Sequence, residues 1–393
     1  MSTFQLYPTL EVKPVFRELR NINECYVFSS IKNSRVSSTQ SSYHCVAESH
    51  TSPPFYPLRV HIYKSGLGFS ETVASVMWIL LLGAPALFFM YRWFKERQQL
   101  TNPQNKYVLI TGCDSGFGNL LAKKLDLKGL QVLAACLTEK GASDLKEATS
   151  SRLQTLILDV TDSNNVAAAA RWADGVVGDQ GLWGLVNNAG ISVPVAPNEW
   201  LTKDDFMKIL NVNLLGVVDV TVKMLPLIRK AKGRIVNVAS IAGRITLGGG
   251  GYFMSKYGVE SFSDSLRCEV ASFGVKVCII EPGFFSTEIT SAKSQKENLI
   301  HIWDRLPEEI KKSYGQEYYD TVYSFLDHIA KICNTDLSLV TDCMEHALMA
   351  VYPRKRYSAG WDAKLIYLPL SYFPSVVTDF LLSIGMPKPA TGI

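Results

Sequence analysis

The chain has 393 residues, 47% of them hydrophobic and 19% charged, with a formal net charge of +4 at pH 7. This charge is small for the length, and no basic stripe interleaved with aromatic residues is present, so the composition gives no case for nucleic-acid binding. Eight cysteines without a Cys-x-x-Cys pair indicate reduced thiols in a cytosol-facing protein, and the six histidines show no metal-ligand spacing, so we assign no metal.

Residues 1–69 show neither the period of a strand nor that of a helix. Serines gather between positions 37 and 42, and prolines between 53 and 57. Such a composition predicts a poorly ordered extension. Met77 is a plausible alternative start, so the sequence leaves open whether residues 1–69 belong to the working protein.

An apolar run follows this extension. Residues 72–91 hold no charged side chain, and about 20 such residues suffice to cross a hydrocarbon core of about 30 Å. The basic residues Arg92, Lys95 and Arg97 lie directly after it, with Trp93 as an interfacial aromatic. We therefore predict a transmembrane anchor at 72–92 with the following chain in the cytosol, the alternative being a buried core helix.

The soluble domain is expected to span 103–393, and it opens with a short buried strand at 106–110. This strand runs into three glycines, Gly112, Gly116 and Gly118, which precede a helical pattern. In a dinucleotide-binding turn the first glycine permits a tight bend, the second lets the backbone approach the pyrophosphate, and the third lets helix pack on strand. The helix N-terminus then faces the phosphates.

Further strands alternate with helical patterns along the domain. We predict strands at 131–136, 153–158, 184–186, 234–238 and 276–280, and long helices at 206–230 and 252–273. This alternation predicts an α/β fold with a doubly wound parallel, Rossmann-like sheet and an N-terminal membrane helix. Ligands of such sheets bind outside the carboxyl ends of the strands, where the polar motifs of this chain fall.

Tyr252 and Lys256 stand four residues apart behind a run of four glycines. In a helix the two side chains lie on one face, so the ammonium group can stabilise the phenolate form of the tyrosine. A Tyr-x-x-x-Lys pair by itself is a common accident, and its meaning depends on the motifs around it.

Those motifs occur in a characteristic order: Thr-Gly-x-x-x-Gly-x-Gly, Asp-Val, Asn-Asn-Ala-Gly, a helical Asn, a strand-end Ser, Tyr-x-x-x-Lys and Pro-Gly. Over about residues 106–290 the chain resembles the short-chain dehydrogenase/reductase family. The segments 111–118, 182–185 and 356–364 further resemble the microsomal retinol dehydrogenases and the related oxidative hydroxysteroid dehydrogenases. That similarity extends from near Met77 to the C-terminus and does not cover 1–69.

The resemblance implies four catalytic residues. Tyr252 would be the general base in alcohol oxidation, and Lys256, together with the positive nicotinamide ring, would lower its pKa. Ser240 would hold the substrate oxygen. Asn213 would carry a water of the proton relay, with Asn211 as the alternative.

The resemblance also implies the cofactor site. Its expected members are Gly112, Ser115, Gly116, Phe117, Gly118, Asp159, Val160, Asn188, Ala189, Gly190, Lys256, Pro282, Gly283 and Thr287. NAD is favoured over NADP, because Glu139 follows the second strand and no arginine stands directly after it. Lys140 opposes this choice.

We thus expect an enzyme of the endoplasmic reticulum membrane, facing the cytosol, that oxidises retinol or a 3α- or 17β-hydroxysteroid with NAD; a homodimer is compatible with the fold. The alternatives are a 3-hydroxybutyrate-type dehydrogenase, which needs a buried cation facing Tyr252, and a scaffold without activity. Aromatic residues between 284 and 325 are expected to pack mainly in the core. The apolar segment 365–382 is expected either to lie on the bilayer or to cap the domain.

Overall fold

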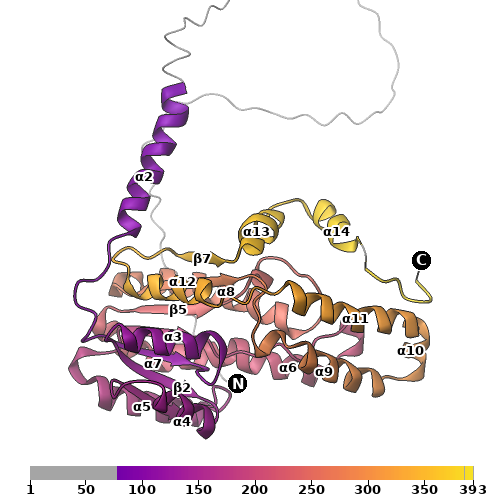
Figure 1. Cartoon of the computed structure of the whole chain (residues 1–393), viewed down its shortest axis with the longest axis horizontal. Helices are drawn as coiled ribbons and strands as arrows, with labels where there is room; N and C mark the ends of the chain where they lie inside the picture. Colours follow the sequence, from indigo (N-terminus) through magenta and orange to yellow (C-terminus); the bar gives the residue numbers. More distant parts are fainter. Residues whose placement is uncertain (1–77, 385, 393) are drawn as a thin grey trace, which may run out of the picture. The chain divides into compact units, whose positions relative to one another are not determined.

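The computed structural model describes residues 78–384 and 386–392. The predicted extension at 1–69 and the first residues of the predicted anchor lie outside this range. The described part begins with a helix, continues into a parallel sheet with helices on both faces, and ends in a short helical tail (Figure 1).

The centre of the domain is a seven-stranded sheet in the order β3-β2-β1-β4-β5-β6-β7, and every neighbouring pair is parallel. The strand order reverses between β1 and β4, which is the point where such sheets bind ligands. The predicted doubly wound, Rossmann-like sheet is therefore confirmed. The strands are β1 Tyr107–Thr111, β2 Gln131–Cys136, β3 Leu153–Ile157, β4 Gly184–Asn187, β5 Arg234–Val238, β6 Lys276–Pro282 and β7 Arg356–Ala359.

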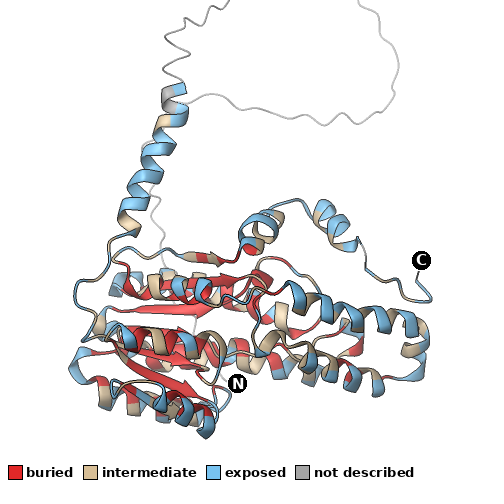
Figure 2. Ribbon diagram, in the orientation of Figure 1, coloured by how far each residue is buried: buried red, intermediate tan, exposed pale blue. Residues whose placement is uncertain are grey.

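Alternate residues of the strands face two separate hydrophobic cores. Val108 and Ile110 of β1 pack in one core with α3 Gly116–Leu127, α4 Glu139–Glu147 and α12 Ser338–Met349. Leu109 packs in the other core, with α5 Ser163–Val177, α7 Val217–Ala231 and α8 Gly251–Val270. Figure 2 shows the buried strands between these more exposed helices.

Local signals start several of these helices. Thr138 accepts a hydrogen bond from the third backbone amide that follows it and so caps α4, and Asp162 caps α5 in a similar way. Thr202 and Asp205 form a capping box at α6 Lys203–Leu210.

Three features differ from the sequence-based prediction. The helix predicted at 206–230 begins at Lys203 and is interrupted by a π-helical segment, η4 Asn211–Gly216. The strand predicted at 276–280 continues to Pro282. Strand β7 was not predicted, because it has four residues and its place depends on pairing with β6.

The remaining helices lie along the chain before the first strand, between strands and after β7. At the N-terminal end are η1 Ile79–Gly83 and α2 Ala84–Glu96, which has no buried residue. Helices α9, α10 and α11 form a lobe to the right of the sheet in Figure 1. Their bounds, with those of the tail and the short turns, are α9 Ala292–Asp304, α10 Glu308–Tyr314, α11 Gln316–Ile332, η8 Ala363–Tyr367, α13 Leu368–Leu370, α14 Ser375–Ser383, η2 Gly178–Gln180, η3 Asn198–Trp200, η5 Ile241–Gly243, η6 Ala271–Phe273 and η7 Glu288–Thr290.

Within the described residues, one helix is long and apolar enough to cross a membrane, Lys203–Ala231. It consists of α6, η4 and α7. Ile209, Val220 and Met224 of this helix are buried in the protein, which identifies it as a core helix.

Candidate active site

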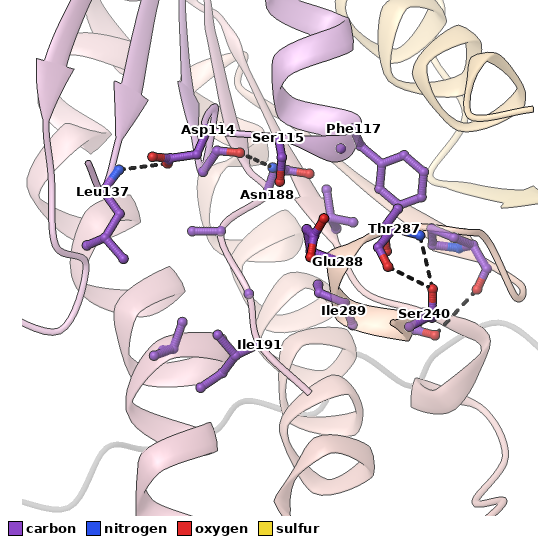
Figure 3. A pocket seen from close by; sticks show the side chains of 18 of the residues that line it. Asp114, Ser115, Phe117, Leu137, Asn188, Ile191, Ser240, Thr287, Glu288 and Ile289 are labelled. Carbon is purple, nitrogen blue, oxygen red and sulfur yellow. Dashed lines mark hydrogen bonds between the residues drawn. The ribbon is translucent and has the colours of Figure 1, made fainter. Parts of the chain in front are cut away.

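A cavity of about 530 Å³ lies at the carboxyl ends of the strands. The glycine turn after β1 and the ends of β3, β4, β5 and β6 line it, together with residues of α8 and the segment 287–290. Figure 3 shows Asp114 and Leu137 at one end of this cavity and Ser240 and Thr287 at the other.

The glycine turn is shaped by close backbone contacts. Gly112 has a φ of +70°, and a Cβ built on it would lie 2.8 Å from the Cα of Ala189. A Cβ on Gly118 would lie 2.4 Å from the carbonyl oxygen of Gly112 and 2.5 Å from Nδ2 of Asn188. Ser115 precedes α3 without capping it through its side chain, so the first amides of α3 are open to an anionic ligand.

The Asn-Asn-Ala-Gly segment holds this turn in place. The Asn188 side chain donates to the carbonyl oxygens of Thr111 and Gly112, each at 3.0 Å. The hydroxyl of Thr111 accepts from the backbone amides of Asn188 and Ala189, also at 3.0 Å. The ends of β1 and β4 are thus joined directly below the cavity.

Tyr252, Lys256 and Ser240 meet at the other end of the cavity. The Nζ of Lys256 lies 5.6 Å from the ring centroid of Tyr252 and donates to the carbonyl oxygen of Val238 at 2.9 Å. Burial lowers the pKa of Lys256 to about 8. The Oγ of Ser240 accepts from Ala242 at 3.1 Å and donates to the carbonyl oxygen of Pro282 at 3.4 Å.

Burial raises the pKa of Tyr252 in the protein alone, and the Ser240 hydroxyl opposes this shift. Desolvation disfavours the phenolate, whereas a hydrogen bond to the phenolate favours it. The sequence-based expectation of a lowered pKa for Tyr252 depends partly on the positive charge of the bound nicotinamide ring. That expectation therefore applies to the complex with the cofactor.

Asn213 lies in the π-helical segment and is fully buried. Its side-chain amide donates to the carbonyl oxygen of Ile191 at 2.8 Å and to Ser255 Oγ at 3.1 Å, and its Oδ1 accepts from the Ile191 amide at 2.8 Å. The side chain thus anchors the segment that follows the Asn-Asn-Ala-Gly motif. The water-carrying role expected for Asn213 stays a prediction.

The predicted cofactor residues converge on the larger cavity with one exception. All of them line it except Gly118, which packs behind the turn; Asn213 does not line it either. The larger cavity is also lined, at both of its ends, by residues that the sequence did not predict. They include Asp114, Leu137, Thr138, Ile191, Glu288, Ile289 and Thr290.

Asp114 is the most informative of the missed residues. Its carboxylate accepts hydrogen bonds from the Leu137 amide at 2.8 Å, the Thr138 amide at 3.0 Å and the Thr138 hydroxyl at 2.7 Å. A carboxylate therefore stands at the end of β2, where the sequence places no Asp. Glu139, on which the choice of NAD rested, is exposed and does not line the cavity. Asp114 is part of the glycine motif, but nothing in the motif indicates the direction of its side chain.

A smaller cavity of about 160 Å³ adjoins Tyr252 and Ser240. Of the described residues that line it, none carries a charge, and most are apolar; they include Val195, Ile241, Leu247, Phe284, Leu326 and Ile329. Its polar residues include Gln295, whose amide donates to Ser192 Oγ at 2.7 Å and to the carbonyl oxygen of Ile289 at 2.9 Å.

The aromatic residues of the helical lobe pack mainly against one another, as predicted. Trp200 is buried, and its ring centroid lies 5.0 Å from that of Trp303 and 5.1 Å from that of Tyr314. Tyr318, Tyr319 and Tyr323 join the same cluster. Phe284 differs, because it lines the smaller cavity.

Comparison with known proteins explains this arrangement. Residues 106–298 match the family described as short chain dehydrogenase. The chain is 56% identical over 317 residues to retinol dehydrogenase 7 of Rattus norvegicus, which covers 81% of this chain and 100% of that protein. The chain belongs to the short-chain dehydrogenase family. The predicted family is thereby confirmed.

Other relatives lead to the same family. The chain is 54% identical over 317 residues to the human (Homo sapiens) 17-beta-hydroxysteroid dehydrogenase type 6, covering 81% of this chain and 100% of that protein. A crystal structure of a short-chain dehydrogenase from Streptomyces avermitilis matches with a TM-score of 0.56 and 25% identity, over 70% of this chain and 95% of that one. As a short-chain dehydrogenase the protein is an alcohol oxidoreductase that uses a nicotinamide dinucleotide.

Proposed function

We propose that this protein interconverts a hydrophobic alcohol, retinol or a 3α- or 17β-hydroxysteroid, and its carbonyl compound, with NAD as the hydride carrier. The observation that carries the proposal is the small, uncharged and mainly apolar cavity that adjoins Tyr252 and Ser240. The names of its relatives, retinol dehydrogenase 7 and 17-beta-hydroxysteroid dehydrogenase type 6, support the same substrate class.

The same cavity argues against a small hydroxy acid as substrate. A carboxylate buried beside Tyr252 needs an Arg or Lys partner, because an unpaired buried charge is costly. Among the described residues that line the smaller cavity there is no such cation. Lys256 lines the larger cavity instead, and its ammonium group bonds to Val238.

The chain supplies the acid–base part of the reaction. NAD, when bound, would supply the hydride acceptor for the substrate carbon. The phenolic oxygen of Tyr252 takes the proton from the substrate hydroxyl, and Ser240 hydrogen-bonds the substrate oxygen. Lys256, charged below its lowered pKa of about 8, favours the phenolate of Tyr252 electrostatically. The apolar wall excludes water, which strengthens these interactions.

The preference for NAD rests on Asp114. A carboxylate near the adenosine ribose accepts a hydrogen bond from the 2′-hydroxyl, whereas it repels the 2′-phosphate of NADP. The three hydrogen-bond donors of Asp114 are uncharged, so none of them neutralises its negative charge.

A membrane location is supported by α2. Its large apolar side chains, including Leu87, Phe88, Phe89 and Met90, are exposed. The part of the helix before Arg92 carries no charge, and an exposed apolar helix suits lipid better than water. We propose an anchor at 72–92 in the endoplasmic reticulum membrane, a catalytic domain at 103–393 facing the cytosol, and a C-terminal apolar segment on the bilayer surface. A homodimer stays a prediction.

Purified membranes that contain the full chain test this proposal with retinol, androstanediol and 3-hydroxybutyrate, each with NAD and with NADP. We expect turnover of at least one of the two lipids with NAD. Tyr252→Phe should remove this activity, because the ring stays while the proton carrier is lost. Tyr257→Phe, on the exposed side of the same helix, is the matched control. Near-normal oxidation by Tyr252→Phe, or turnover of 3-hydroxybutyrate alone, would contradict the proposal.

A further inference from the structure

Two arginines and two glutamates from four different segments form a charged cluster behind Ser240 and Pro282. Its members are Arg244 after η5, Glu260 on α8, Glu281 on β6 and Arg356 on β7. The side chain of Glu281 is 1% exposed and that of Glu260 is 8% exposed. We refer to these four residues as the buried charge cluster.

Both glutamates of the cluster are paired with arginine. Arg244 Nη1 donates to Glu281 Oε1 at 3.1 Å, and Ser358 Oγ donates to the other oxygen of Glu281 at 3.0 Å. Arg356 donates to Glu260 Oε2 through Nε at 3.1 Å and through Nη2 at 2.9 Å. The Nε of Arg356 also lies 3.5 Å from Glu281 Oε1, so the four side chains form one connected group.

The buried charge cluster is not explained by a contribution to the free energy of folding alone. Glu260 Oε1 is buried without a hydrogen-bond partner among the described residues. Burial, and then the nearby charge of Glu281, raise the pKa of Glu260 to about 7. Well-packed apolar side chains are often at least as stabilising as a buried ion pair. The position of the cluster gives it a more specific role.

The cluster holds the segment 240–244 from two sides. Glu281 directly precedes Pro282, whose carbonyl oxygen accepts from Ser240 Oγ at 3.4 Å. On the opposite side the segment packs tightly on α8. A Cβ built on Gly243 would lie 2.8 Å from the carbonyl oxygen of Lys256 and 3.0 Å from Cγ of Glu260. The Arg244–Glu281 pair therefore joins the segment that carries Ser240 to the strand that ends at Pro282.

We propose that Arg244 and Glu281 are positioning residues, which fix Ser240 and the Pro282 wall of the nicotinamide site relative to Tyr252. This inference rests on the roles given to those residues in the proposed function. Without the pair, the Ser240 segment and the end of β6 can separate, and a misplacement of about 1 Å at a reacting centre can cost roughly a hundredfold in rate.

Glu281→Gln, Arg244→Met and the double variant, each in the full chain, test the inference. The double variant removes both charges of the pair together, so it avoids the unbalanced charge that each single change leaves. Tyr372→Phe is the control, because Tyr372 is exposed and accepts from the other end of the Arg244 guanidinium at 2.8 Å. Titration with ADP-ribose, which lacks nicotinamide, measures the concentration of folded nucleotide-binding sites.

For both single variants and the double variant we expect unchanged ADP-ribose affinity, NADH binding weakened about tenfold, and kcat per folded site lowered about tenfold or more. Tyr372→Phe should match the wild type. The double variant should recover thermal stability relative to the single variants without recovering kcat. Unchanged NADH affinity and kcat in the single variants, or a double variant in which stability and kcat recover together, would overturn the inference. A wild type that binds NADH but oxidises no lipid alcohol would instead refute the proposed function. The comparison of NADH affinity with ADP-ribose affinity would still test the positioning role of Arg244 and Glu281.

Discussion

We propose that Asp114 sets the choice between NAD and NADP, and the substitution Asp114→Asn tests this proposal with little change in shape. The carboxylate accepts from Leu137 through one oxygen and from Thr138 through the other. An asparagine whose carbonyl faces Thr138 turns its amide group toward the Leu137 N–H, so one hydrogen bond is lost. The variant also removes the negative charge from this end of the cavity.

Two magnitudes set the expected effects. Loss of one hydrogen bond to a charged group costs about 1–3 kcal/mol, which in a domain of this size lowers the melting temperature by a few degrees. Two unit charges about 6 Å apart repel by roughly 3 kcal/mol at an effective dielectric constant of about 20, and by about half as much at about 40. We therefore expect the ratio of NADP to NAD affinity to rise about tenfold to a hundredfold.

Fluorescence titrations of NADH and NADPH measure this ratio in the wild type and in Asp114→Asn. Glu139→Gln is the matched control, because Glu139 follows the same strand but does not line the cavity. The ratio should also depend on ionic strength, since added salt screens the repulsion. An unchanged ratio in Asp114→Asn, or an equal change in Glu139→Gln, would refute the reasoning.

Three further predictions concern the other half of the site and its supports. With NAD bound, the phenolate of Tyr252 should form at lower pH than in the protein alone, because burial raises its pKa and the positive nicotinamide ring favours the phenolate. Ultraviolet titration of the wild type minus Tyr252→Phe measures this, and an unchanged or higher pKa would contradict it. Gly118→Ala should abolish NADH binding in a titration, because its Cβ would lie 2.4 Å from a backbone carbonyl oxygen, whereas Gly175→Ala meets nothing within 4 Å and should bind normally. Asn213→Ala should lower the melting temperature by several degrees, since it leaves two partly buried backbone groups of Ile191 unpaired at about 1–3 kcal/mol each; an unchanged melting temperature would contradict this reasoning.

Features that depend on neighbours in the chain were predictable. Segments of five or six residues that are rich in apolar and β-branched side chains and lie between turn signals identified β1, β2, β3, β5 and β6 to within two residues at each end. The glycine turn was predictable in detail, because close backbone contacts admit no side chain at Gly118. Since the carboxyl ends of parallel strands meet at one edge, the separate motifs could be assigned to one site.

Contacts between distant segments were not predictable in this way. Strand β7 has four residues and forms only through its pairing with β6, so no local pattern marks it. The interruption of the long helix at η4 accompanies the bonds of Asn213 to Ile191, a residue of another segment. For the same reason the sequence points to Glu139, which follows β2 directly, whereas the carboxylate that bonds to the end of β2 is that of Asp114.

The sequence by itself determined the family, the glycine turn and the edge of the sheet where the family's motifs meet, because these depend on residue types at short spacing. Only the tertiary structure decided that Asp114 reaches the end of β2, that no charged side chain is among the described residues lining the smaller cavity, and that Arg244 meets Glu281. Each of these depends on the direction of side chains from segments far apart in the chain. Packing sets that direction, and a linear pattern does not contain it.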